Sequence, residues 1–177
     1  MWRYSFFTPS MVRVVKSPHG ESFKKESLSV VALPEKVGFK VGTKDGAIVM
    51  GTKELQVSLD TSTGALSYET ADGRHLLAEK PAEKTPSLLF DDAGDATYNV
   101  YQAFKLETDE AIYGLGQLQN GKMSQRGQVK NLVQGNVEDV SPFHPVYQRI
   151  RGFSGTNYSP TLFTDNASET FFPFGGG

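Results

Sequence analysis

Cysteine is absent from this 177-residue sequence, which excludes disulfides, thiolate metal sites and cysteine nucleophiles. Long apolar runs are absent too: none approaches the roughly 18 residues of a membrane span, so we expect no membrane partner. Neither sign of charge dominates, since 18 basic and 20 acidic residues give a formal net charge of -2. Without a basic stripe to displace counterions from a phosphate backbone, we expect no nucleic-acid partner.

Signatures of cofactor, metal and hydrolase chemistry are also missing. The sequence has no G-x-S-x-G elbow, no H-E-x-x-H motif and no glycine-rich phosphate loop. Its three histidines, His19, His75 and His144, are far apart and have no ligand-spaced neighbour. The aspartates between residues 91 and 95 form an acidic turn that resembles a calcium loop, but the twelve-residue pattern and its closing glutamate are missing. We therefore expect no cofactor and no metal.

Helical periodicity is the last absence, and alternation takes its place. In the stretch 55–59, Leu55, Val57 and Leu59 occupy every second position, as in a strand with one buried face. Asp45-Gly46 and Asp72-Gly73 are hairpin-turn signals between such stretches. The predicted strands cover residues 2–7, 11–15, 28–32, 37–41, 47–50, 55–59, 65–69, 75–78, 98–106 and 146–150. Short strands at regular spacing predict an all-β fold, an antiparallel β-sandwich, formed as one domain by residues 1–177.

The predicted core takes one face of these strands. Its members share period-two spacing: Val12, Val14, Leu55, Val57, Leu59, Val100 and Phe104. The segment from Glu79 to Pro86 carries charges and two prolines, so we predict a surface connection there.

One long polar stretch interrupts the strands. It follows the short apolar strand 111–113 and runs for about twenty residues rich in Gln, Asn and Gly, a length that is unusual for a loop inside a compact domain. Side-chain amides offer donors and acceptors together, and Arg126, Glu138 and Asp139 add charge. Such a loop suits a polyhydroxylated ligand; the alternative is a solvated loop with no ligand.

Several motifs in this order carry a family resemblance. They are Phe7 to Val14, Leu55 to Gly64, Tyr113-Gly114-Leu115-Gly116-Gln117, Arg126-Gly127 and Asn136-Val137-Glu138-Asp139. Together they resemble the N-terminal segment of glycoside hydrolase family 31, which contains α-glucosidases and α-xylosidases. The likeness fails between about His144 and Thr156, where the family's tryptophan and acidic residue are missing, and it resumes at Asn157.

The resemblance implies a galactose-mutarotase-like N-terminal domain of a retaining α-glycosidase in carbohydrate metabolism. In that family the two catalytic aspartates lie on a (β/α)8 barrel that follows this region, so no residue here is assigned a catalytic role. The implied partners are an α-linked oligosaccharide and the catalytic barrel in the same polypeptide. The implied substrate-binding residues are Glu138, Asp139 and Arg126, where Arg126 either buttresses the loop or approaches a sugar hydroxyl.

Two readings of the whole chain remain open. The first is a fragment of a longer enzyme, inactive by itself, which the abrupt end at Gly175-Gly176-Gly177 favours. The second is a free-standing carbohydrate-binding or adhesive β-sandwich module. The start of the sequence does not have the pattern of a signal peptide, while the bacterial origin that the resemblance suggests favours a periplasmic or secreted location. The sequence does not distinguish glucose from xylose.

Overall fold

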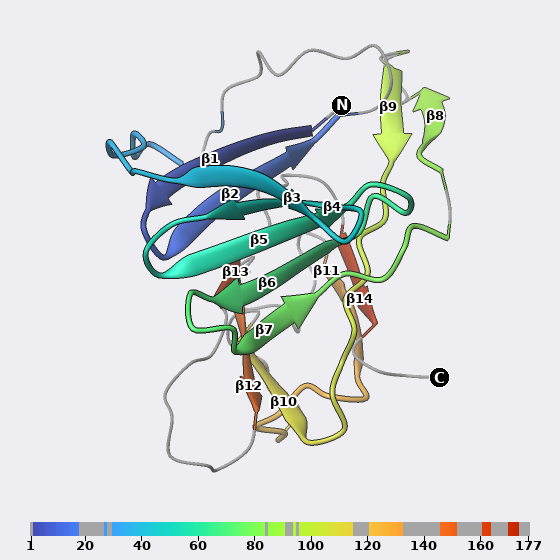
Figure 1. The fold of residues 1–177 in the computed structure, drawn as a ribbon. Helices are drawn as coiled ribbons and strands as arrows, with labels where there is room; N and C mark the ends of the chain where they lie inside the picture. Colours follow the sequence, from blue (N-terminus) through green and yellow to red (C-terminus); the bar gives the residue numbers. More distant parts are fainter. Residues whose placement is uncertain are drawn as a thin grey trace. The chain divides into compact units, whose positions relative to one another are not determined.

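A computed structural model gives the fold of this chain (Figure 1). It describes residues 2–17, 27, 30–83, 85–90, 94, 96–114, 121–132, 146–151, 161–163 and 170–173. The chain divides into two compact units, Met1–Lys105 and Leu106–Gly177. Within the described residues all regular structure is β, and every strand pair is antiparallel, as the sequence predicts.

The first unit is built on a five-stranded meander in which sequence neighbours pair (Figure 1). Its strands, in spatial order, are β3 (Lys40–Lys44), β4 (Ala47–Gly51), β5 (Leu55–Asp60), β6 (Leu66–Thr70) and β7 (His75–Ala78). The turn between β3 and β4 has positive φ at both Asp45 (50°) and Gly46 (78°), as a two-residue hairpin of the primed type requires. The predicted hairpins at Asp45-Gly46 and Asp72-Gly73 are confirmed.

A second hairpin, β1 (Trp2–Thr8) and β2 (Met11–Lys16), supplies the other side of the core. Phe6 of β1 is buried with four residues from the meander, namely Met50, Leu55, Val57 and Leu66. Val57 and Leu66 are almost fully buried, and each such side chain contributes about 1.5–3 kcal/mol of hydrophobic free energy. Val12, Val14 and Leu59 pack against this cluster and are partly buried. The core residues predicted on β2 and β5 are therefore confirmed.

The predicted strand over residues 98–106 is wrong. The short hairpin of β8 (Ser87–Phe90) and β9 (Ala96–Asn99) ends at Asn99, and Val100, which we expected in the core, is 63% exposed. Phe104 is half-buried and forms only an isolated antiparallel bridge with Glu79. The aromatic and β-branched residues of this stretch fit a strand locally, but a strand also needs a neighbouring backbone along its whole length.

Two further predictions in this unit fail. The strand predicted at residues 28–32 is absent from its described part, residues 30–32, where Val31 is 90% exposed; Leu28 and Ser29 lie outside the described residues. The strand predicted at residues 37–41 begins only at Lys40, as β3. Glu79, expected on a surface connection, is 5% exposed, although residues 80–83, 85 and 86 are exposed as predicted. Of the acidic turn between residues 91 and 95 only Gly94 is described, so its aspartates lie outside the described residues.

The described residues of the second unit form two antiparallel sheets. One is formed by β10 (Glu110–Gly114), β12 (Val146–Arg151) and β13 (Thr161–Phe163), with β12 between the other two. The other pairs β11 (Val129–Leu132) with β14 (Thr170–Pro173). Strand β12 matches the predicted strand at residues 146–150, whereas β11 lies inside the stretch predicted to be one long loop. Only two of the four residues of β11 are apolar, too few to reveal a strand by alternation.

Candidate functional site: the loop after β10

The loop that follows β10 returns to the strand it came from. The backbone N–H of Ile112 donates to Ser124 Oγ at 3.3 Å, and the carbonyl of Ile112 accepts the N–H of Gln125 at 2.7 Å. Ile112 is itself buried, and its bond to Ser124 is partly buried. Residues 124 and 125 are thereby fixed against the middle of β10, although they are distant from it along the chain.

The Arg126-Gly127 step forms the turn that starts β11. The N–H of Gln128 donates to the carbonyl of Gln125 at 3.0 Å, which closes a four-residue turn with Arg126 and Gly127 at its centre. Gly127 has φ of 73°, and a turn with positive φ at its third position favours glycine. Strand β11 begins at the residue after Gln128. The glycine of the Arg126-Gly127 motif is therefore explained by the backbone conformation of this turn.

Arg126 ties this turn to the segment before β10. Its Nη1 donates to the carbonyl oxygens of Glu107 and Glu110, each at 2.6 Å. The acceptors belong to a closed turn, because the N–H of Glu107 donates to Glu110 Oε2 at 3.0 Å and the N–H of Glu110 donates to the carbonyl of Glu107 at 3.3 Å. Bonds from a charged donor are stronger than neutral ones, so the guanidinium anchors the base of the loop.

The structure places one of the three predicted binding residues. Arg126 is half-buried at the anchor just described, and its contact with a sugar remains a prediction. Glu138 and Asp139 lie outside the described residues, as do Leu115, Gly116 and Gln117 of the strand-end motif.

Two residues of the loop base have roles that the sequence did not reveal. Gln125 is almost completely buried, and its Nε2 donates to the carbonyl of Lys122 at 3.0 Å. Ser124 Oγ accepts from the N–H groups of both Ile112 and Arg126. A glutamine and a serine inside a polar stretch have the composition of a solvated loop, so no local signal distinguishes them from exposed neighbours.

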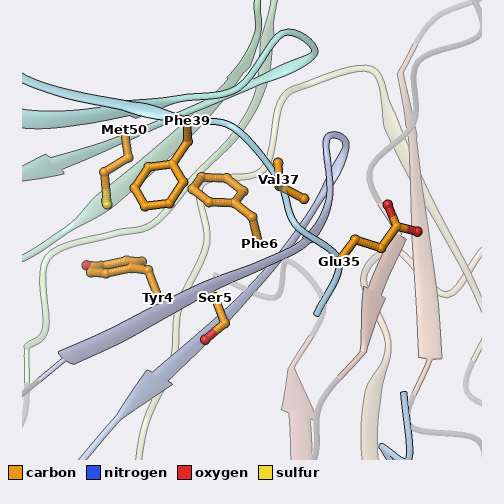
Figure 2. Close-up of a pocket in the computed structure, with 7 residues that line it drawn as sticks. All are labelled: Tyr4, Ser5, Phe6, Glu35, Val37, Phe39 and Met50. Carbon is orange, nitrogen blue, oxygen red and sulfur yellow. The ribbon is translucent and has the colours of Figure 1, made fainter. Parts of the chain in front are cut away.

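A hollow of about 310 Å³ lies in the first unit, away from the loop in sequence (Figure 2). It is lined by Tyr4, Ser5 and Phe6 of β1, by Glu35, Val37 and Phe39 of the segment before β3, and by Met50 of β4. The rings of Phe6 and Phe39 lie together, with centroids 5.3 Å apart. Figure 2 shows the Glu35 carboxylate and the Ser5 hydroxyl directed away from these rings. A sugar site needs polar groups that converge on the ligand, so this apolar hollow does not have that character.

Within the part of the chain that the structure describes, no three His, Asp or Glu side chains are grouped closely enough to hold a metal ion. His75 lies on β7 and is half-buried; His19 and His144 lie outside that part. No helix long and apolar enough to cross a membrane occurs among the described residues.

Comparison with known proteins identifies the family. Residues 1–172 match the model of the glycosyl hydrolase 31 N-terminal galactose mutarotase-like domain. The α-xylosidase of Saccharolobus solfataricus is 30% identical over 164 residues, a match that covers 87% of this chain and 22% of that protein. This chain therefore spans about a fifth of the length of its curated relative.

Solved structures of the same family have the same fold. The α-xylosidase of Xanthomonas citri superposes with a TM-score of 0.80 at 27% identity, over 96% of this chain and 17% of that one. The dextranase of Flavobacterium johnsoniae shares the fold, with a TM-score of 0.68 at 20% identity over 97% of this chain and 20% of that one. The antiparallel β-sandwich class predicted from the sequence is therefore confirmed. By fold and by sequence, the chain belongs to glycoside hydrolase family 31, as an N-terminal galactose mutarotase-like domain.

Proposed function

We propose that this chain is the N-terminal domain of a retaining α-glycosidase and that it supplies a substrate-contacting loop to a catalytic barrel in the same polypeptide. The observation that carries the proposal is the anchored base of the loop after β10. Arg126 donates to two carbonyls of the turn at residues 107–110, and Ser124 and Gln125 bind the backbone of Ile112. A loop that contributes to a binding site must be held close to its productive geometry, and these contacts hold its base.

The substrate class that we favour is an α-xyloside. The relative from Saccharolobus solfataricus and the solved structure from Xanthomonas citri are both α-xylosidases. The dextranase shares only the fold at its identity of 20%, so its substrate carries less weight. An α-glucoside is the second candidate, and the ratio of kcat/KM for the two aryl glycosides decides between them.

The chemistry divides between the two parts of such an enzyme. A retaining mechanism uses one carboxylate as nucleophile and a second as acid and base, and the family resemblance locates both on the barrel. The role of this domain is binding: Glu138 accepts hydrogen bonds from vicinal sugar hydroxyls, with Asp139 as its neighbour. Charge-assisted bonds of this kind are stronger than neutral ones, which favours a carboxylate at this point of the loop.

Kinetics of the full-length enzyme test the proposal. Glu138→Ala is expected to lower kcat/KM by about tenfold or more, because a hydrogen bond to a charged group contributes about 1.5–3 kcal/mol. Glu54→Ala, which changes an exposed glutamate of the first unit, is the matched control and should leave kcat/KM unchanged. Wild-type kinetics for both Glu138→Ala and Asp139→Ala would remove the loop from the substrate site.

Arg126 needs a separate experiment, because two roles are possible for it. As an anchor alone, Arg126→Ala should speed hydrogen exchange of the amides of Gln125 and Gln128 in the absence of sugar. As a sugar contact, it should also raise KM beyond the increase that Gly127→Ala produces, since Gly127→Ala disturbs the same turn and leaves the guanidinium in place. An unchanged exchange rate in Arg126→Ala would contradict the anchor.

The isolated 177-residue chain is expected to be inactive, because the residues that perform the chemistry are assigned to the barrel. Purified chain should not hydrolyse an aryl α-xyloside or α-glucoside faster than buffer does. Turnover above that background would contradict the division of roles.

A further inference from the structure

A buried carboxylate lies at the end of the five-stranded sheet. The side chain of Glu79, the residue after β7, is 4% exposed. Its Oε2 accepts two hydrogen bonds, from Lys16 Nζ at 2.7 Å and from the backbone N–H of Leu66 at 3.1 Å. Removing an ionised carboxylate from water is costly, and an apolar side chain of similar size would avoid that cost. We therefore ask which parts of the chain the Glu79 carboxylate holds in place.

Lys16 connects this carboxylate to a distant part of the chain. Its ammonium lies 2.5 Å from Gln102 Oε1 and 4.7 Å from the centroid of the Trp2 ring. One cation at the end of β2 thus contacts β1, the residue after β7 and the segment that follows β9. We call Lys16, Glu79 and Gln102 the clasp.

Backbone hydrogen bonds also attach the segment held by the clasp. The N–H of Lys80 donates to the carbonyl of Ala103 at 2.9 Å, and the N–H of Lys105 donates to the carbonyl of Ala78 at 2.8 Å. Phe104 forms the isolated bridge to Glu79 between these two bonds. Such a short ladder at a sheet edge has a low local opening free energy, so side chains that hold its ends change its lifetime.

Directly after this segment, the chain forms the turn at residues 107–110, to which Arg126 anchors the loop after β10. Lys105 is the last residue of the first unit, and Glu107, two residues later, provides one of the two carbonyls bound by Arg126. We propose that Lys16 and Glu79 are positioning residues: by holding residues 102–105 they restrain the turn at residues 107–110 and hence the base of the loop. The link from the loop base to catalysis rests on the proposed function, whereas the restraint itself does not.

Hydrogen exchange in the full-length polypeptide tests the restraint. Lys16→Met removes the cation, and Gln102→Ala removes only the outer arm of the clasp at an exposed side chain. Lys53→Met is the matched control, because Lys53 lies 3.5 Å from Glu54 in an exposed pair. In Lys16→Met the amides of Lys80 and Lys105 are expected to exchange about tenfold faster, and those of Gln125 and Gln128 at least threefold faster. Because loss of the ion pair also lowers the stability of the first unit, the Gly64 amide is expected to be unchanged only in Gln102→Ala, which leaves the pair in place. Gln102→Ala should give the same pattern with smaller increases.

Kinetics and rescue separate positioning from general loosening. Lys16→Met should raise KM several-fold with kcat within twofold of wild type, and Lys16→Arg, which keeps the charge, should restore most of both exchange and KM. If Lys16→Met also accelerates the Gly64 amide, the fold itself has loosened and Gln102→Ala decides the question. Unchanged exchange at Gln125 and Gln128 in Gln102→Ala, with faster exchange at Lys80 and Lys105, would overturn the proposal. Faster exchange at Gln125 with an unchanged KM would support the clasp and contradict the proposed role of the loop.

Discussion

Gly64 lies directly against the indole of Trp2: a Cβ atom built on Gly64 would be 3.2 Å from Cζ2 of the ring. Gly64 lies in the turn between β5 and β6 and has φ of 71°, so both its backbone conformation and its neighbour disfavour a larger residue. This turn is the end of the family motif from Leu55 to Gly64. Gly64 thus allows the turn between β5 and β6 to pack closely against Trp2 of β1.

We expect Gly64→Ala to destabilise the first unit by more than its turn conformation alone explains. A left-handed conformation costs a residue other than glycine about 1–2 kcal/mol, and crowding of Trp2 adds about 1 kcal/mol or more. Gly73→Ala is the matched control, because Gly73 has φ of 84° and no atom within 4 Å of its built Cβ. Chemical denaturation of both variants measures the difference, and equal losses of free energy would show that the ring accommodates the methyl group.

The carboxylate of Asp60 in the same turn predicts a pH effect. Hydrogen bonds lower the pKa of Asp60 from 3.8 to about 2. The bond from the Ser62 hydroxyl has the largest effect, followed by those from the N–H groups of Thr63 and Ser62. A lowered pKa in the folded state means that the stabilisation is present above pH 3.8 and is lost as the pH falls towards 2. Ser62→Ala should raise the pKa of Asp60 towards 3.8, measured by NMR titration of its carboxyl carbon. An unchanged pKa would contradict the assigned cause.

Truncation of Val57 tests the core. Its side chain is 0% exposed, and Val57→Ala should reduce the free energy of unfolding by about 1–3 kcal/mol, from lost apolar contact and the cavity left behind. Val41→Ala, at an exposed position on the edge strand β3, should change it by less than about 0.5 kcal/mol. The denaturant midpoints of the two variants give the comparison. A midpoint for Val57→Ala equal to that of the wild type would contradict the placement of Val57 in the core.

Loss of the ion pair between Lys16 and Glu79 should also lower stability. Among the described residues, Lys16→Met leaves the buried carboxylate with the Leu66 N–H as its one donor, and we expect a loss of about 1.5–3 kcal/mol. The value is below that of a fully buried pair because the Lys16 side chain is 34% exposed. A double-mutant cycle with Glu79→Gln, followed by denaturation, isolates the pair. Additive single and double losses would mean that the two side chains do not stabilise each other.

Local patterns in the sequence predict the fold class and much of the first unit. Alternation in Leu55, Val57 and Leu59 identifies a buried face because side chains of a strand alternate between its two sides. Asp45-Gly46 identifies a hairpin because both residues tolerate positive φ. These signals are local, so they can be read without a partner strand. The motifs, taken in order, indicate the family, and the match of the family model to residues 1–172 confirms it.

Long-range contacts set which apolar and polar residues depart from those local rules. Val31 and Val100 are exposed although their local sequence fits a strand, and β11 forms within a polar stretch. Strand formation depends on a partner backbone that is distant along the chain, as in the pairing of Val129 with Pro173. Glu79 is buried because its cation comes from a residue 63 positions earlier, and charge alone places a glutamate at the surface. Arg126 became an anchor for the same reason: its acceptors are backbone carbonyls, which every residue has and no sequence motif marks.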